Sequence, residues 1–197
     1  MEILKKVLIG VAVIVALFFV VAAFLSSEYR VERSVVVNTS PDVVYPFVAE
    51  LEQWRDWSPW AEMEPTAKYT FTGVPGEAGS KWSWKGEIVG EGSLQHDELV
   101  KNKSIKSSLK FVSPQPMTSV EEWSFEPTDG GTKVVWIDEG ELGYPMGRYF
   151  GLFLDDMLGT DFEKGLAKLK SLAEAKAAEI AKEAEEVKEE APIETVE

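Results

Sequence analysis

The stretch NTSPDVVYPFVAELEQWRDWSPW, residues 38–60, decides how the fold begins. Thr39 or Ser40 is suited to cap a helix, and Pro41 is favourable at the first helical position. The apolar residues that follow repeat at helical spacing: Val43, Val44, Phe47, Val48 and Leu51. Because helices usually end before a proline, we expect this helical segment to stop before Pro59. Three large rings, three residues apart, would then share one side of a short helix and the loop after it: Trp54, Trp57 and Trp60.

The residues on either side of this stretch have the period of β-strands. Before it, residues 29–38 (YRVERSVVVN) are rich in β-branched side chains, which favours a strand. After it, from Ala67 to Leu142, apolar and polar residues alternate between recurring turn residues. This pattern predicts an antiparallel meander with strands near residues 67–72, 80–85, 91–98, 104–112, 118–127 and 132–142.

One face of the predicted sheet is rich in aromatic residues. Because successive side chains of a strand point to opposite faces, residues two apart share a face. The aromatic face carries Tyr69, Phe71, Trp82, Trp84, Ile105, Leu109, Phe111, Trp123, Phe125, Val134 and Trp136. The opposite face carries charged side chains, as a solvated surface does: Lys81, Lys85, Lys106, Lys110, Glu122 and Glu126.

After the meander the period becomes helical again. One long apolar stripe predicts a single long helix: Phe150, Phe153, Leu154, Met157, Leu158, Phe162, Leu166, Leu169 and Leu172. Beyond it, residues 173–197 form an acidic tail whose apolar positions are mostly alanine at heptad spacing. Two interpretations of this tail stay open: a coiled coil that gives weak self-association, or a solvated and partly frayed helix. Pro192 would end either helix.

The N-terminal segment, residues 1–27, contains an uncharged apolar run, VLIGVAVIVALFFVVAAFL, at residues 7–25. At about 1.5 Å per residue this run is roughly 28 Å long, close to a hydrocarbon core of about 30 Å. It therefore predicts a transmembrane anchor. The alternative is a cleaved signal peptide, with residues 21–23 as a small-residue cleavage site. The apolar run is longer, however, than the apolar region of a signal peptide, which usually has about 7–15 residues.

The orientation of the anchor depends on its flanking charges. Lys5 and Lys6 precede the span, whereas Arg30 and Arg33 follow it, so the positive-inside count is level. A short head with two lysines is typical of a signal-anchor that keeps its N-terminus in the cytoplasm. We therefore expect a single-pass protein of the cytoplasmic membrane whose domain, residues 28–172, lies on the outer side.

Composition narrows the functional classes. The chain is 45% hydrophobic and 27% charged, which is typical of a globular protein rather than a disordered one. A net charge of −14 disfavours a nucleic-acid partner, since a grip on phosphates needs a basic face. The chain has no cysteine and a single histidine, His96. These counts exclude thiolate chemistry and disfavour His-rich metal sites and histidine-dependent triads, so we expect no metal and no cofactor.

The predicted order is a strand, two short helices, a meander and a long helix, which is the helix-grip order. Four stretches in that order resemble the SRPBCC superfamily, the START and Bet v 1-like group, in its bacterial polyketide cyclase/dehydrase and lipid transport branch. They are residues 38–60 quoted above, WSWKGEIVGEGSL (82–94), EPTDGGTKVVW (126–136) and GLFLDDMLGTDFEKGLAKLKSLAE (151–174). The resemblance covers residues 31–172.

This resemblance implies an α+β helix-grip fold, in which a curved antiparallel sheet surrounds the long C-terminal helix. It also implies an apolar cavity between sheet and helix that binds lipids, sterols, polyketides or other hydrophobic small molecules. The candidate ligand-binding residues are Tyr69, Phe71, Trp82, Trp84, Phe111, Trp123, Phe125 and Trp136 on the sheet, with Phe150, Phe153, Leu154 and Met157 on the helix. Each of these is also a plausible core residue.

No catalytic motif of the superfamily carries over to this chain. Asp138 follows Trp136 on the inward face and is the first candidate for an acid or base, and Asp155 and Asp156 come next. The alternative is that Asp138 lies in water near the end of the sheet and that Asp155 and Asp156 face solvent. His96 is expected on the strand surface rather than in a proton relay. Three hypotheses follow: a membrane-anchored binding module for a hydrophobic molecule or lipid, a cyclase-like or hydrolase-like enzyme, and an interaction module that uses the acidic tail.

Overall fold

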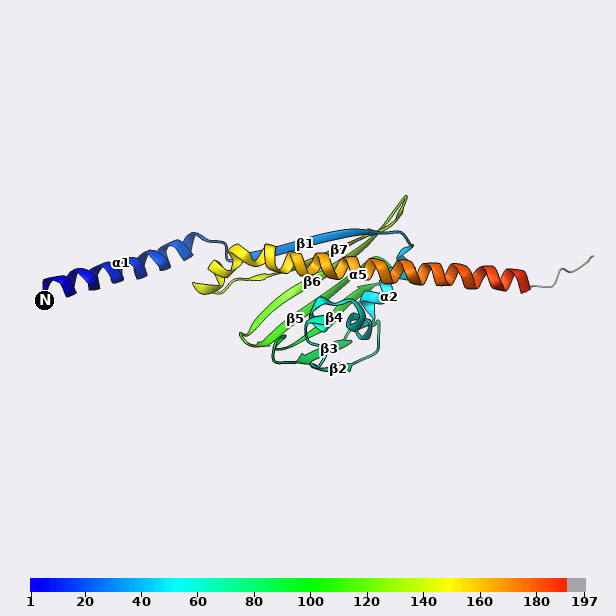
Figure 1. The fold of residues 1–197 in the computed structure, drawn as a ribbon, viewed down its shortest axis with the longest axis horizontal. Helices are drawn as coiled ribbons and strands as arrows, with labels where there is room; N and C mark the ends of the chain where they lie inside the picture. The colour runs from blue at the N-terminus through cyan, green and yellow to red at the C-terminus, as the bar shows by residue number, and fades with distance from the viewer. Residues whose placement is uncertain (191–197) are drawn as a thin grey trace, which may run out of the picture.

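The computed structural model describes residues 1–190 (Figure 1). The expected helix stop at Pro192 lies outside the described residues. The helical elements are α1 (Glu2–Phe24), α2 (Pro41–Ala49), the 3-10 turn η1 (Leu51–Gln53), α3 (Trp54–Trp57), α4 (Pro59–Met63) and α5 (Met146–Glu190). The strands are β1 (Glu28–Val37), β2 (Lys68–Thr72), β3 (Lys81–Lys85), β4 (Glu91–Val100), β5 (Ser104–Ser113), β6 (Met117–Thr128) and β7 (Gly131–Glu141).

The strands form one seven-stranded antiparallel sheet in the order β1-β7-β6-β5-β4-β3-β2. The predicted meander is confirmed, because β2 to β7 pair in sequence order. The first strand closes the other edge by pairing with the last, with Val31 opposite Asp138. Helix α5 crosses one face of this curved sheet (Figure 1). The expected α+β helix-grip architecture is therefore confirmed.

Two contacts hold α5 on the sheet. The ring of Phe162 stacks on Trp136 of β7, with centroids 3.9 Å apart. Arg33 of β1 bridges to Asp155 at 3.0 Å and to Glu163 at 2.8 Å on the exposed side of α5. A Cβ atom at Gly159 would overlap the Arg33 guanidinium, so glycine leaves room for this flexible side chain to lie against α5.

The helices between β1 and β2 supply tryptophans to the core. Trp54 and Trp57 are almost fully buried, and their indole N–H groups donate to the Val48 and Phe47 carbonyls, both at 2.9 Å. The two rings pack edge-on against Trp123 and Trp136 of the sheet. Two of the three tryptophans expected to share a side, Trp54 and Trp57, therefore lie at the centre of the core, whereas Trp60 is half-buried and packs against it.

His96 is fully buried, so its expected position on the strand surface is wrong. It follows Gly92 and Leu94 in the inward alternation of β4 and lies under α2. Its Nδ1 lies 2.8 Å from Ser107 Oγ and its Nε2 lies 3.2 Å from the Val48 carbonyl oxygen. Burial lowers the pKa of His96 to about 4, so the ring is neutral and acts as a core residue that links α2 to the sheet.

Helix α1 is exposed along most of its length and is long and apolar enough to cross a membrane. A signal sequence passes the same test of length and composition. At the other end of the domain, α5 continues through the acidic tail to Glu190, and its side chains from Ala178 to Lys188 are exposed. Both interpretations of the tail predict such exposure in a single chain. Self-association through it stays a prediction.

Candidate ligand-binding site

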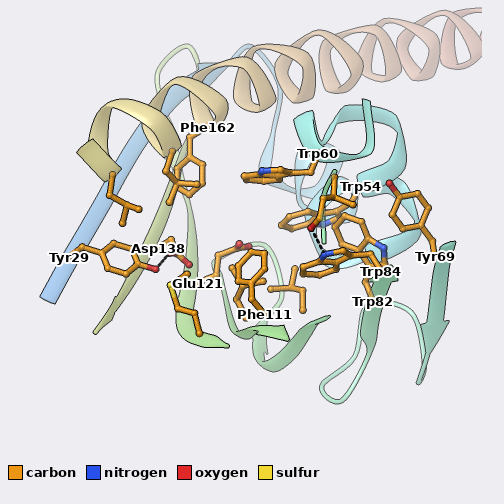
Figure 2. Close-up of a pocket in the computed structure, with 16 residues that line it drawn as sticks. Tyr29, Trp54, Trp60, Tyr69, Trp82, Trp84, Phe111, Glu121, Asp138 and Phe162 are labelled. Atoms are coloured by element: carbon orange, nitrogen blue, oxygen red, sulfur yellow. Dashed lines mark hydrogen bonds between the residues drawn. The ribbon is translucent and has the colours of Figure 1, made fainter. Parts of the chain in front are cut away.

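A cavity of about 160 Å³ lies between the sheet, α5 and the α3–α4 segment (Figure 2). Its walls are almost entirely aromatic and aliphatic. The lining residues are Tyr29, Trp54, Trp60, Tyr69, Trp82, Trp84, Val89, Leu94, Leu109, Phe111, Met117, Glu121, Asp138, Leu154, Leu158 and Phe162. An apolar cavity with a few polar groups is the usual form of a small-molecule site.

The candidate residues from the sequence fall into two groups on the sheet. Tyr69, Trp82, Trp84 and Phe111 line the cavity. Trp123, Phe125 and Trp136 do not, because other side chains cover them and they are at most 2% exposed in the core. Phe71 lies at the sheet edge, where it lines a polar surface hollow with Glu52 and Arg55.

The candidates on α5 divide in the same way. Leu154 lines the cavity, whereas Phe150, Phe153 and Met157 are exposed and lie outside it. The physical reason is that the first turns of α5 are apolar on more than one side. At about 100° per residue, Phe153 lies roughly 100° around the axis from Leu154 and cannot face the same wall. Leu158 and Phe162, one and two turns further along, complete the helical wall.

Three polar side chains meet at one end of the cavity, where Asp138 of β7 is buried as expected from the inward alternation. The Tyr29 hydroxyl donates to Asp138 Oδ1 at 2.6 Å, and the Ser119 hydroxyl donates to Oδ2 at 2.8 Å. Gly140 makes this geometry possible, since a Cβ there would lie 3.0 Å from the Tyr29 ring and 3.2 Å from Ser119. Both Asp138 oxygens are therefore occupied by partners within the protein.

Glu121 is a second buried carboxyl group at this end, and the sequence interpretation did not single it out. It lies on β6 directly opposite Asp138 and is 3% exposed. Trp123 Nε1 donates to Glu121 Oε1 at 2.7 Å, and Oε2 has no hydrogen-bond partner among the described residues. A signal was present, because Glu121 precedes Trp123 and Phe125 in the same inward alternation.

The two carboxyl groups share an environment that favours their neutral forms. Burial raises the pKa of Glu121 to about 8; the Trp123 N–H lowers that pKa, and the charge of Asp138 raises it further. Burial also raises the pKa of Asp138, against the hydrogen bonds from Tyr29 and Ser119. No lysine, arginine or histidine of the described chain lines the cavity. Glu121 is therefore mainly protonated at neutral pH and can donate a hydrogen bond into the cavity.

The opposite end of the cavity is formed by aromatic rings. Figure 2 shows Asp138, Glu121 and Tyr29 at one end and the rings of Trp82, Trp84 and Tyr69 at the other. Trp82 Nε1 is buried and has no hydrogen-bond partner within the described part of the chain. Surrounding atoms cover this N–H, so it costs stability without being open to a molecule in the cavity.

Glu64, a third buried carboxylate, has a structural role. Its oxygens accept three backbone N–H groups, from Glu87 at 2.8 Å, Ile88 at 2.8 Å and Val89 at 2.9 Å. These bonds lower the pKa of Glu64, so it stays ionised. The carboxylate therefore fixes the loop between β3 and β4, which places Val89 in the cavity wall.

Asp155 and Asp156 lie outside the cavity. Both are exposed, and the bond with Arg33 lowers the pKa of Asp155, so this carboxylate is ionised and engaged at the surface. They lack the buried setting that an acid–base group needs. Within residues 1–190, no cluster of three or more histidine, cysteine, aspartate or glutamate side chains has an arrangement that would hold a metal ion.

Comparison with known proteins agrees with this geometry. Residues 28–174 match the family described as "Polyketide cyclase / dehydrase and lipid transport". The chain belongs to this family. The resemblance to the SRPBCC superfamily is thereby confirmed for the whole helix-grip domain. No curated protein matches the sequence.

Solved structures share the fold at low identity. A protein of unknown function from Staphylococcus aureus is 16% identical with a TM-score of 0.59, over 77% of this chain and 96% of that one. A protein from Rhizobium leguminosarum is 17% identical with a TM-score of 0.54, over 75% and 95%. The di-domain ARO/CYC StfQ from the steffimycin biosynthetic pathway is 14% identical with a TM-score of 0.61, over 77% and 52%.

Proposed function

We propose that this family member is a membrane-anchored binding protein for a small, mainly apolar molecule that carries a hydrogen-bonding group. The observation that carries the proposal is the apolar cavity closed at one end by the protonated Glu121 carboxyl beside Asp138. The aromatic walls favour a flat, unsaturated ligand, since rings stack and pack edge-on against one another. The single polar end at Glu121 fixes which way round the ligand binds.

The size of the cavity limits the ligand. An engineered apolar cavity of about 150 Å³ in another protein holds benzene. The 160 Å³ cavity therefore fits one aromatic ring with a short substituent. A phospholipid or a multi-ring polyketide would need α5 or the loop at Val89 to move away from the sheet.

The charge of the site limits the ligand further. A carboxylate on the ligand would face Glu121 and Asp138 without a cation to balance it, which is unfavourable in a buried site. A hydroxyl or carbonyl group instead accepts the Glu121 proton in a hydrogen bond. The proposed class is thus a neutral phenol-like or ketone-like molecule.

The anchor part of the proposal rests on α1. Most of its apolar surface is exposed, apart from Ala22 and the Phe18 ring that stacks on Tyr149, so water is an unfavourable surrounding for the rest. A bilayer would cover that surface and hold the cavity near apolar molecules dissolved in the membrane. We keep the outer side of the cytoplasmic membrane as the expected location of the domain.

Native mass spectrometry of the full chain, released from detergent after expression in cells, tests the proposal. We expect one small neutral molecule per chain, recovered by organic extraction. Leu109→Trp should abolish its capture, because Leu109 lines the cavity and a larger ring would fill it. Leu99→Trp is the matched control, since Leu99 packs against the core without lining the cavity. Equal loading of both variants would exclude the cavity as the binding site.

Acid–base catalysis in the same cavity is a second candidate, favoured by the pair of buried carboxyl groups with raised pKa values. Such pairs are common where a neutral acid must act at neutral pH. Glu121→Gln separates the two candidates. It keeps a hydrogen-bonding group of the same shape, so a binding protein would still capture its ligand, whereas an enzyme would bind it without converting it.

A further inference from the structure

The corner between β7 and α5, residues 143–153, has the sequence GYPMGRYFGLF. Arg148 is its single charged side chain, in a chain whose net charge is −14. The apolar side chains of this corner face outward: Met146 is 67% exposed and Phe153 is 61% exposed. Phe150 and Leu152 are exposed with them. A concentrated apolar surface of this kind marks a contact with a membrane or another protein.

The same corner is attached to the end of α1. The Tyr149 hydroxyl donates to the Phe18 carbonyl at 2.7 Å, and its ring stacks on Phe18 at 4.7 Å. The Tyr144 hydroxyl donates to the Phe19 carbonyl at 2.8 Å. Figure 1 shows α1 leaving the domain at the end where α5 begins. The exposed apolar surface of the corner is therefore continuous with that of α1.

These bonds fix the depth of the corner relative to the span. Phe18 and Phe19 lie about six residues before the end of the apolar run, or roughly 9 Å at 1.5 Å per residue. Helices that lie in a membrane interface insert to depths of about 5–10 Å. With α1 across the bilayer, the tyrosine hydroxyls of the corner therefore lie roughly 9 Å below the end of the apolar run, within the depth that interfacial helices reach.

The polar atoms of the corner suit that depth. Arg148 donates to the carbonyls of Ala22 at 3.1 Å and Ala23 at 3.3 Å, at the C-terminal end of α1. A cation there complements the helix dipole. The two tyrosines are of the type that gathers at membrane interfaces, with an apolar ring and a polar tip.

From these contacts we propose that residues 143–153 insert into the interface of the same leaflet in which α1 ends, as a second membrane contact. The proposal rests on the membrane anchor of the proposed function. It holds the domain in one orientation, with the start of α5 and the Tyr29 end of the sheet toward the lipid. Leu154 lines the cavity and directly follows Phe153, the last residue of the corner. The proposed lipid contact therefore ends one residue before the cavity wall.

Single-cysteine labelling of the full chain tests the insertion, and no native cysteine interferes. Three variants carry an environment-sensitive fluorophore: Phe153→Cys in the corner, Val13→Cys in α1 and Asp129→Cys in the exposed β6–β7 turn. Each is reconstituted into phosphatidylcholine vesicles with and without a spin label near the top of the acyl chain. We expect the probe at 153 to lose most of its emission to the spin-labelled lipid and the probe at 129 to lose none.

The outcomes separate the corner from the anchor. The spin-labelled lipid could leave the emission at 153 unchanged while a spin label at the end of the acyl chain quenches the probe at 13. That result would overturn the insertion and leave the anchor intact. Exposure of both probes to water would overturn the anchor as well. A probe at 153 that is shielded only at high protein density, without lipid quenching, would show that a second copy covers the corner, which also overturns the proposal.

Discussion

The substitution Trp136→Ala is expected to lower the free energy of unfolding by about 3–5 kcal/mol, the range for truncating a large buried aromatic residue. Trp136 is fully buried and stacks on Phe162 of α5 and on Trp123, with centroids 3.9 Å and 4.4 Å apart. Its loss leaves a void where the sheet holds the long helix. Urea titration of the full chain in detergent, followed by tryptophan near-ultraviolet circular dichroism, measures the change.

Ile88→Ala is the control for this prediction. Ile88 lies in the loop between β3 and β4 and is 68% exposed. Its truncation should change the free energy of unfolding by no more than about 0.5 kcal/mol. If Trp136→Ala costs no more than this control, the stacked rings do not hold α5 on the sheet, and the core lies elsewhere.

The free energy of unfolding of the wild-type chain, relative to Glu121→Gln, is expected to fall as the pH rises from about 5 to 8. The pKa of Glu121 is about 8 in the folded protein, whereas unfolded glutamate has a pKa of about 4.3. The folded chain thus binds more protons than the unfolded chain between these values. The stabilisation is complete below about pH 4 and is lost as the pH rises, with a slope approaching 1.4 kcal/mol per pH unit and a total of about 5 kcal/mol.

The comparison with Glu121→Gln isolates this effect from His96. Burial lowers the pKa of His96 to about 4, so its contribution is complete above about pH 6.5 and is lost as the pH falls. It opposes the Glu121 effect below pH 6.5 but is the same in both proteins. Urea titrations at several pH values give the difference directly. A difference that does not vary with pH would mean that Glu121 is ionised in the folded protein.

Much of the fold is predictable from the sequence because the spacing of apolar residues switches abruptly between the period of a strand and that of a helix. The β-branched run before residue 38, the alternation between Ala67 and Leu142 and the helical stripe after Gly143 each match the element observed there. The packing of Trp54 against Trp57 is predictable as well, since rings at helical spacing next to an aromatic sheet face pack together.

The candidate site is less predictable, for two physical reasons. Helical periodicity identifies apolar positions but not which partner covers them, so Phe153 and Leu154 look equivalent although only Leu154 lines the cavity. A charged residue in an inward position looks like a surface residue when its neighbour is also charged. The pair Glu121-Glu122 shows this, because the strand turns one carboxyl inward and the other toward Lys106.

The proposed function requires that Glu121 hydrogen-bonds to a small apolar ligand in the cavity. Phenol and toluene test it most directly, because they have the same shape and differ by a hydroxyl or a methyl group. Their affinities are measured by equilibrium dialysis against the full chain in nanodiscs, with empty nanodiscs subtracted, for wild type and Glu121→Leu. Toluene binding by the variant also shows that its cavity is intact.

We predict that the ratio of phenol affinity to toluene affinity falls about tenfold in Glu121→Leu, since a net hydrogen bond of about 1.4 kcal/mol corresponds to that factor. Toluene itself should bind both proteins. An unchanged ratio, or a wild-type chain that binds neither molecule, would contradict the account.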